Sequence, residues 1–206
     1  MPCMALTPEQ RKEYLSIAGR VVRPGSGSGP LTLRERTAAY GTPDLRCLAG
    51  RVEFVVVGGL ATRLYMPERM TLDTDVLVLP GDAPRAEAAL SDAGCEKRGP
   101  LTIGGGTWLM PDGRTLDLIV LDAPWVEAAV HAPVQGSDGL PYIALPYLVL
   151  MKLAAGRMQD LADIGRMLGA ADDSTLETTR GIVRRYRAGD TEDLESMIRL
   201  GKLEHE

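Results

Sequence analysis

The chain has 206 residues, of which 45% are hydrophobic and 25% are charged, and its formal net charge is −5. This length and composition are typical of a globular protein with one domain, or with one core and a helical extension, and they allow a sizeable hydrophobic core. The net negative charge argues against a broad nucleic-acid-binding surface.

Nothing in the sequence predicts a membrane protein or a secreted one. The longest apolar run, residues 142–151, is too short to cross a bilayer, and the N-terminus lacks the basic and apolar segments of a signal peptide. The three cysteines lie far apart without a CxxC pair, so neither a disulfide framework nor a zinc site is expected. We therefore expect a cytoplasmic protein without a membrane partner.

The first forty residues predict two helices and a linker. Thr7 and Pro8 are typical of a helix N-cap followed by proline at the first helical position, so we expect a helix over residues 7–22. Glycine, serine and proline over residues 24–30 indicate a flexible linker. A second helix is expected over residues 31–40.

The middle of the chain predicts a small mixed β-sheet with helices packed on it. Three runs rich in apolar and β-branched residues predict strands over residues 53–57, 75–79 and 115–121. Helices are expected from Leu60 and from Pro84, and residues 104–106, all glycine, are expected to form a turn between two short extended pieces. This order of elements predicts the α/β (α+β) class.

Beyond residue 141 the pattern predicts helices. Residues 147–155 and 158–168 are apolar at helical spacing, and Asp172 and Asp190 stand where the N-caps of two further helices are expected. We therefore divide the chain into a core of residues 1–130, which includes the N-terminal helices, and a helical C-terminal region of residues 131–206. Four arginines near the end are most simply a solvated helix face: Arg180, Arg184, Arg185 and Arg187.

Three carboxylates are the candidates for chemistry. Asp73 and Asp75 are two residues apart at the start of a predicted strand, so their side chains are expected on one face. Asp117 stands inside the apolar run of another predicted strand. If the two strands are neighbours, the three acids converge, and their mutual repulsion calls for a cation between them. Oxygen ligands favour Mg²⁺, although each acid alone could be a strand-end cap or an ion-pair partner.

Gly58 and Gly59 follow a predicted buried strand and precede a predicted helix. The N-terminus of a helix presents free backbone N–H groups, and glycine allows a phosphate to approach them closely. The pair is therefore a candidate phosphate-binding turn, although most Gly-Gly pairs are ordinary turns.

These residues together resemble the nucleotidyltransferase superfamily, the polymerase-β-like fold. Its signature is an apolar strand, Gly-Gly or Gly-Ser, about a dozen residues, Asp-x-Asp, and later a third Asp on a neighbouring strand. Here Gly58-Gly59 is followed after thirteen residues by Asp73-Thr74-Asp75 and later by Asp117. The string from Arg69 through Thr71 to Asp75 is similar to the branch that contains AbiEii-type toxins and related small bacterial nucleotidyltransferases.

The resemblance implies an enzyme that moves a nucleoside monophosphate from an NTP to an acceptor hydroxyl and releases pyrophosphate. It implies two Mg²⁺ ions, for which Mn²⁺ could substitute, held by Asp73, Asp75 and Asp117. Asp117 would also help to deprotonate the acceptor. The implied nucleotide-binding residues are Gly58, Gly59, Arg69 and Thr71, with ATP as one candidate donor.

Lys152 is a further catalytic candidate with two open interpretations. It belongs to a segment with Arg157, Asp160 and Asp163 at spacings that also resemble the AbiEii branch. On a continuous helix Lys152 and Asp163 would lie at nearly the same angle. Lys152 either contacts phosphate or acceptor while an aspartate orients it, or it forms a salt bridge that braces two helices.

The acceptor and the biological role are left open by the sequence. The acceptor could be a tRNA end, a protein hydroxyl or a small molecule such as an antibiotic. The resemblance to AbiEii-type toxins implies a toxin–antitoxin or phage-defence role with a cognate antitoxin as partner. The alternatives are a stand-alone antibiotic-modifying enzyme and a non-catalytic protein that only binds nucleotide or a partner.

Overall fold

The computed structural model describes residues 44–66, 71 and 73–205. The helices predicted over residues 7–22 and 31–40, and the linker between them, lie outside the described residues. Residues 42–206 form one compact unit. No helix within the described part of the chain is long and apolar enough to span a bilayer.

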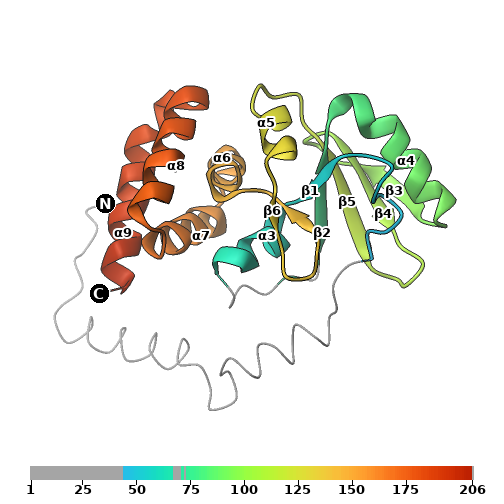
Figure 1. Cartoon of the computed structure of the whole chain (residues 1–206), viewed down its shortest axis with the longest axis horizontal. Coiled ribbons are helices and arrows are strands. Elements are labelled where there is room, and N and C mark those ends of the chain that lie inside the picture. The colour runs from blue at the N-terminus through green and yellow to red at the C-terminus, as the bar shows by residue number, and fades with distance from the viewer. Residues whose placement is uncertain (1–43, 67–70, 72, 206) are drawn as a thin grey trace, which may run out of the picture. The chain divides into compact units, whose positions relative to one another are not determined.

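A seven-stranded mixed sheet forms the centre of this unit (Figure 1), in the order β3-β4-β5-β2-β1-β7-β6. The strands in chain order are β1 Phe54–Val56, β2 Thr74–Val78, β3 Glu96–Pro100, β4 Gly105–Leu109, β5 Thr115–Val120, β6 Val134–Gln135 and β7 Pro141–Tyr142. Strands β2 and β5 are parallel, as are β1 and β7, and the other neighbouring pairs are antiparallel. The predicted α/β class with a mixed sheet is confirmed.

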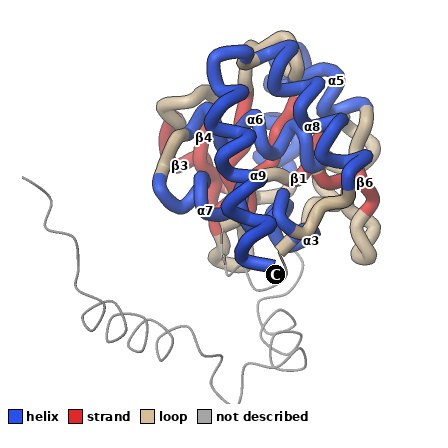
Figure 2. Tube along the Cα trace, turned by 90° about the vertical axis from the view of Figure 1, so that its left-hand side faces the viewer, coloured by secondary structure: helices blue, strands red, loops and turns tan. Residues whose placement is uncertain are grey.

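The described part of the chain has seven α-helices and two short 3₁₀ helices, the latter at Pro80–Asp82 and Ala188–Asp190. The α-helices are α3 Gly58–Tyr65, α4 Ala83–Asp92, α5 Val126–His131, α6 Leu145–Ala155, α7 Met158–Gly169, α8 Asp173–Tyr186 and α9 Thr191–His205. Helices α6 to α9 gather on one side of the molecule in Figure 1, and Figure 2 shows them from that side, in front of the strands.

Three details differ from the sequence-based expectations. Gly105 and Gly106 belong to β4, so the turn comes earlier, and a β-carbon on Gly105 would lie 1.9 Å from the backbone oxygen of Leu118. The short strands β6 and β7 and the helix α5 were not predicted, because they are too short to show a period. Since β6 and β7 lie beyond residue 130 and join the sheet, the division of the chain at that residue stays a prediction.

Helix burial follows the spacing of apolar residues. In α7 the buried positions Asp160, Asp163, Ile164, Met167 and Leu168 recur every three or four residues, as one face of a helix requires. In α6 seven of the eleven positions are buried, and the exposed ones, Ala154 and Ala155, stand at its C-terminal end. The predicted N-cap at Asp172 is confirmed, since its carboxylate accepts the backbone N–H of Thr175 at 2.7 Å.

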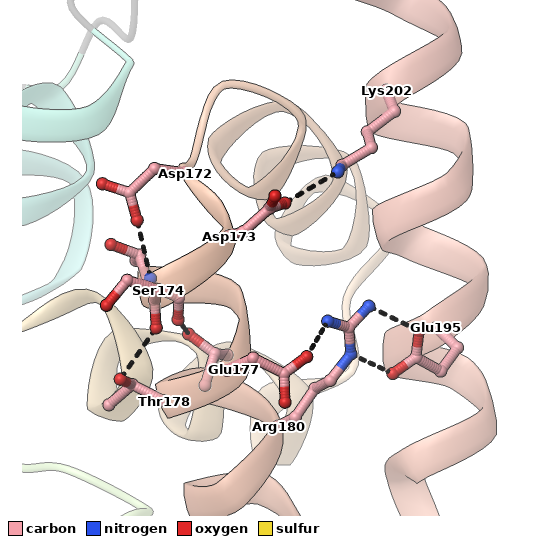
Figure 3. A network of polar contacts seen from close by, with 10 residues as sticks. Asp172, Asp173, Ser174, Glu177, Thr178, Arg180, Glu195 and Lys202 are labelled. Atoms are coloured by element: carbon pink, nitrogen blue, oxygen red, sulfur yellow. Dashed lines mark hydrogen bonds and ion pairs between the residues drawn. The ribbon is translucent and has the colours of Figure 1, made fainter.

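Arg180 joins α8 to α9 and accounts for one member of the arginine cluster (Figure 3). Its Nε and Nη2 donate to the two carboxylate oxygens of Glu195 at 2.6 and 3.0 Å, and its Nη1 donates to Glu177 at 2.7 Å. Arg187 pairs with Asp190 in the same region. Two of the four arginines therefore hold the helical region together.

Helices α7 and α9 approach each other at two glycines. A β-carbon on Gly201 of α9 would lie 1.9 Å from the backbone oxygen of Gly165 on α7, so the helices can meet there only without a side chain. Gly181 of α8 is a matched contrast, because a β-carbon on it would meet nothing within 4 Å.

We predict that Gly201→Ala destabilises the protein and that Gly181→Ala does not. The first substitution forces two packed helices apart, at a cost of about 1–3 kcal/mol, whereas the second removes an exposed helical glycine and should stabilise by about 0.5–1 kcal/mol. Urea unfolding of both variants checks this. Equal stability of the two variants would contradict the close helix contact.

Candidate functional site

Three side chains form a row across the sheet at the start of β2 and β5. Asp75 of β2 pairs in register with Asp117 of β5, which in turn pairs with Thr107 of β4. Neighbouring strands lie about 4.8 Å apart, and paired residues point to the same face, so the two carboxylates stand side by side. Thr107 Oγ1 donates a hydrogen bond to Asp117 Oδ1 at 2.6 Å. The expectation that the strands carrying these acids are neighbours is confirmed.

The pairing makes ionisation of Asp75 costly. Its pKa is raised from 3.8 to about 6, first by burial and then by the negative charges of Asp117 and Asp73. The backbone N–H of Gly59 and the positive charge of Arg157 act in the opposite direction and lower this pKa. Burial and the two neighbouring carboxylates therefore outweigh the groups that favour the charged form of Asp75.

The two glycines at the start of α3 allow the chain to pass close to these acids. Gly58 has a φ of +60°, and a β-carbon on it would lie 1.9 Å from Asp75 Oδ2. A β-carbon on Gly59 would lie 2.7 Å from the side chain of Thr71. A side chain at position 58 would therefore collide with Asp75, and one at position 59 would collide with Thr71.

The remaining predicted residues are distributed around this turn. Asp73 precedes β2 by one residue and is exposed, and its backbone N–H donates to Thr71 Oγ1 at 3.3 Å. The backbone oxygen of Thr71 accepts from Arg63 Nη2 of α3 at 3.0 Å. Arg69, predicted to bind nucleotide, lies outside the described residues.

One cavity of about 440 Å³ brings the predicted residues together. Its polar end includes Gly58, Gly59, Thr71 and the three acids, and Asp117 and Ile119 of β5 line it in alternation with Leu121, the residue after the strand. The helical side contributes two cations and a fourth acid: Lys152, Arg157 and Asp160. The other lining residues are apolar: Leu101, Ile103, Trp125, Leu148, Met151, Ala154 and Ala155. The cavity is large enough for a small ligand.

The donor set fits a hard divalent cation by its chemistry. Three carboxylates that line one cavity offer oxygen ligands alone, which suit Mg²⁺ or Mn²⁺. Among residues 44–66, 71 and 73–205, however, no group of three or more His, Cys, Asp or Glu side chains is arranged to hold a metal ion. The three acids therefore suit a divalent cation by residue type and charge, and not by the present arrangement of their side chains.

Lys152 is the centre of a buried ion network at the corner between α6 and α7. Its Nζ donates to Asp160 Oδ1 at 3.1 Å and to Asp163 Oδ2 at 2.7 Å. The three side chains are only 7%, 5% and 5% exposed. Asp160 Oδ2 also accepts from Arg157 Nε at 2.6 Å, and the Arg157 side chain is 77% exposed.

This geometry corrects one premise about Lys152. The segment is not a continuous helix, because Gly156 has a φ of +62° and separates α6 from α7. Lys152 and Asp163 meet across the corner between two helices and not along one helix face. Because the ammonium group is buried between two carboxylates, the arrangement favours the interpretation in which Lys152 braces the two helices.

Sequence reasoning missed Thr107 and named Arg157 without assigning it a role. Thr107 holds Asp117 by a hydrogen bond, but a threonine in a strand carries no signal of such a contact. Arg157 is the exposed cation of the cavity. Its place in the Lys-Arg-Asp-Asp segment was a signal, but sequence alone did not distinguish its exposure from the burial of Lys152.

No family model and no curated protein matches the sequence. Among solved structures, a solution structure of the antibiotic-resistance factor ANT(2″)-Ia is similar, with a TM-score of 0.43 and 15% identity over 87% of this chain and 97% of that chain. A crystal structure of ANT(2″)-Ia in complex with adenylyl-2″-tobramycin has a TM-score of 0.40 and 18% identity over 72% of this chain and 87% of that chain.

We predict that Asp75→Asn stabilises the metal-free protein, and more so at pH 8 than at pH 5. In the unfolded chain Asp75 titrates near 3.8 and in the folded chain near 6, so the wild type loses stability as the pH rises through this window. An asparagine avoids this loss, and its advantage should grow by on the order of 1 kcal/mol between the two pH values. Thermal melts in EDTA at both pH values provide the measurement. An advantage that is constant with pH would contradict the raised pKa.

We predict that Lys152→Met strongly destabilises the fold. Methionine has a similar volume but leaves Asp160 and Asp163 as buried carboxylates without the ammonium group between them, which should cost about 3–5 kcal/mol. Lys202→Met is the control, because the side chain of Lys202 is 48% exposed and that of its partner Asp173 is 95% exposed. This control should change stability by less than about 1 kcal/mol. If denaturant unfolding shows the two variants to be alike, Lys152 is not a brace.

Proposed function

We propose that this chain is a metal-dependent nucleotidyltransferase that transfers a nucleoside monophosphate from an NTP to an acceptor hydroxyl. The observation that supports the proposal is the in-register pairing of Asp75 with Asp117 at one end of a 440 Å³ cavity. Two adjacent carboxylates in a partly buried site are costly without a cation. A bound metal ion would offset the repulsion between the two carboxylates and would attract a phosphate to the same place.

Asp73, Asp75 and Asp117 would hold Mg²⁺, two ions being expected and Mn²⁺ being the substitute. A bound pair of divalent ions supplies stabilisation of the negative charge that develops on the attacking and leaving oxygens of phosphoryl transfer. Asp73 is exposed and lines the cavity, so metal and triphosphate would reach it from solvent.

The chain's own groups would position the reactants. Thr107 fixes the orientation of Asp117 through its hydrogen bond, so the second oxygen of Asp117 is the one that would accept the proton of an acceptor hydroxyl. Gly58 and Gly59 keep the start of α3 free of side chains beside Asp75, which leaves room for phosphate oxygens. The apolar wall around Leu148 and Met151 would exclude water from the nucleotide.

The acceptor decides which kind of nucleotidyltransferase the protein is. The three candidate acceptors are a tRNA end, a protein hydroxyl and a small molecule such as an antibiotic. A toxin–antitoxin role belongs to the first two classes. The alternative, a protein that binds NTP without turning it over, would use the same cavity. A transfer assay separates these possibilities, because only an enzyme leaves label on an acceptor.

We predict that Asp75→Asn and Asp117→Asn each reduce transfer by at least about a hundredfold while the fold is kept, because each removes a metal ligand. Each NTP, labelled at its α-phosphate, is incubated with Mg²⁺ and with tRNA, cell protein or a panel of antibiotics, and labelled acceptor is counted. Asp92→Asn is the control, since Asp92 pairs with Arg51 on the surface and should leave the activity unchanged.

Two outcomes would contradict the proposed function. Transfer by Asp75→Asn at the wild-type rate would remove the acids from the chemistry. Equal NTP affinity in EDTA and in Mg²⁺, measured by calorimetry, would show that the nucleotide does not bind through a metal.

A further inference from the structure

The cavity has two cations among its described lining residues, and they differ in what they can reach. Lys152 is 7% exposed, and its ammonium group already donates to two carboxylates. The side chain of Arg157 is 77% exposed. A ligand that enters the cavity can therefore contact the guanidinium group of Arg157 without disturbing the buried network.

Asp160 holds Arg157 in place with both of its carboxylate oxygens. Oδ2 accepts from Arg157 Nε at 2.6 Å, and Oδ1 accepts from Lys152 at 3.1 Å and from Arg157 Nη2 at 3.5 Å. Because Asp160 is 5% exposed and also bound by the lysine, it is a rigid anchor for the arginine. These contacts use one Nε and one Nη2 donor of a guanidinium that has five N–H donors in all, so the other donors remain for a ligand.

Arg157 lines the same cavity as the three acids. The arginine comes from the α6–α7 corner, and the acids come from β2 and β5. An anion bound between them could meet metal ions on the sheet side and the guanidinium on the helical side.

We propose that Arg157 binds the terminal phosphates of the NTP, so that the cavity selects nucleoside triphosphates over monophosphates. The proposal rests on the proposed function. A planar guanidinium suits phosphate oxygens because it can donate two parallel hydrogen bonds. Lys152 and Asp163 then act at a distance, as the buried partners that keep Asp160 in position.

The test measures nucleotide affinity by calorimetry with Mg²⁺ for ATP, ADP and AMP, or for the corresponding series of whichever NTP binds best. Arg157→Gln should weaken triphosphate binding at least tenfold and monophosphate binding less than twofold, with the diphosphate between them. Arg157→Lys, which keeps the charge and loses the fork, should restore part of the affinity. Arg166→Gln is the matched control on α7, since Arg166 pairs with Glu204 and does not line the cavity.

The dependence on phosphate number separates binding from structure. A merely structural arginine would weaken all three nucleotides alike, and that result would overturn the proposal, as would unchanged triphosphate affinity in Arg157→Gln. If the wild type binds NTP in the presence of Mg²⁺ and Arg157→Gln binds it with the same affinity, the proposed function stands and this inference fails. If the wild type binds no nucleotide in the presence of Mg²⁺, both fail together.

Discussion

Two carboxylates lie side by side on adjacent parallel strands in this protein. Several neighbouring groups reduce the electrostatic cost of this pairing. Because Asp75 and Asp117 are in register, their side chains cannot avoid one another without a shift of the whole sheet. The neighbouring groups reduce the cost locally. Thr107 donates to Asp117, and the backbone N–H of Gly59 favours the charged form of Asp75. The positive φ of Gly58 and its missing side chain make room for the same carboxylate.

The helical region contains a second group of charges, which Lys152, Asp160, Asp163 and Arg157 form at the corner between α6 and α7. A lysine between two aspartates is a net negative group when all three are charged, and burial makes such a charge unfavourable. Arg157 balances it from the surface through Asp160. The network therefore joins α6 and α7, fixes one arginine at the cavity, and leaves no described member of it free to move alone. Stability and a potential binding group are thus supplied by the same contacts.

The sequence predicts the parts of this structure that repeat or alternate. The strands β1, β2 and β5 and the helices α4 and α6 to α9 follow from apolar spacing and caps, and the two-residue spacing of Asp73 and Asp75 points to a common edge. Sequence could not give the register that sets Asp75 opposite Asp117, since register depends on contacts across the sheet. It could not distinguish Lys152 from Arg157 either, because their burial is decided by the bend at Gly156.

The bend at Gly156 sets the place of Arg157 at the cavity. The described sheet residues that line the polar end of the cavity are acids, and the glycines and Thr71 beside them carry no charge, so a positive partner for an anionic ligand has to come from elsewhere. A helix continuing through residue 156 would carry Arg157 onward along the axis of α6. The left-handed conformation of Gly156 ends α6 instead, and Arg157 becomes the residue before α7. There its backbone is extended, its side chain is anchored by Asp160, and its guanidinium group faces the cavity with donors to spare. The corner between two helices is therefore as much a part of the site as the acids are.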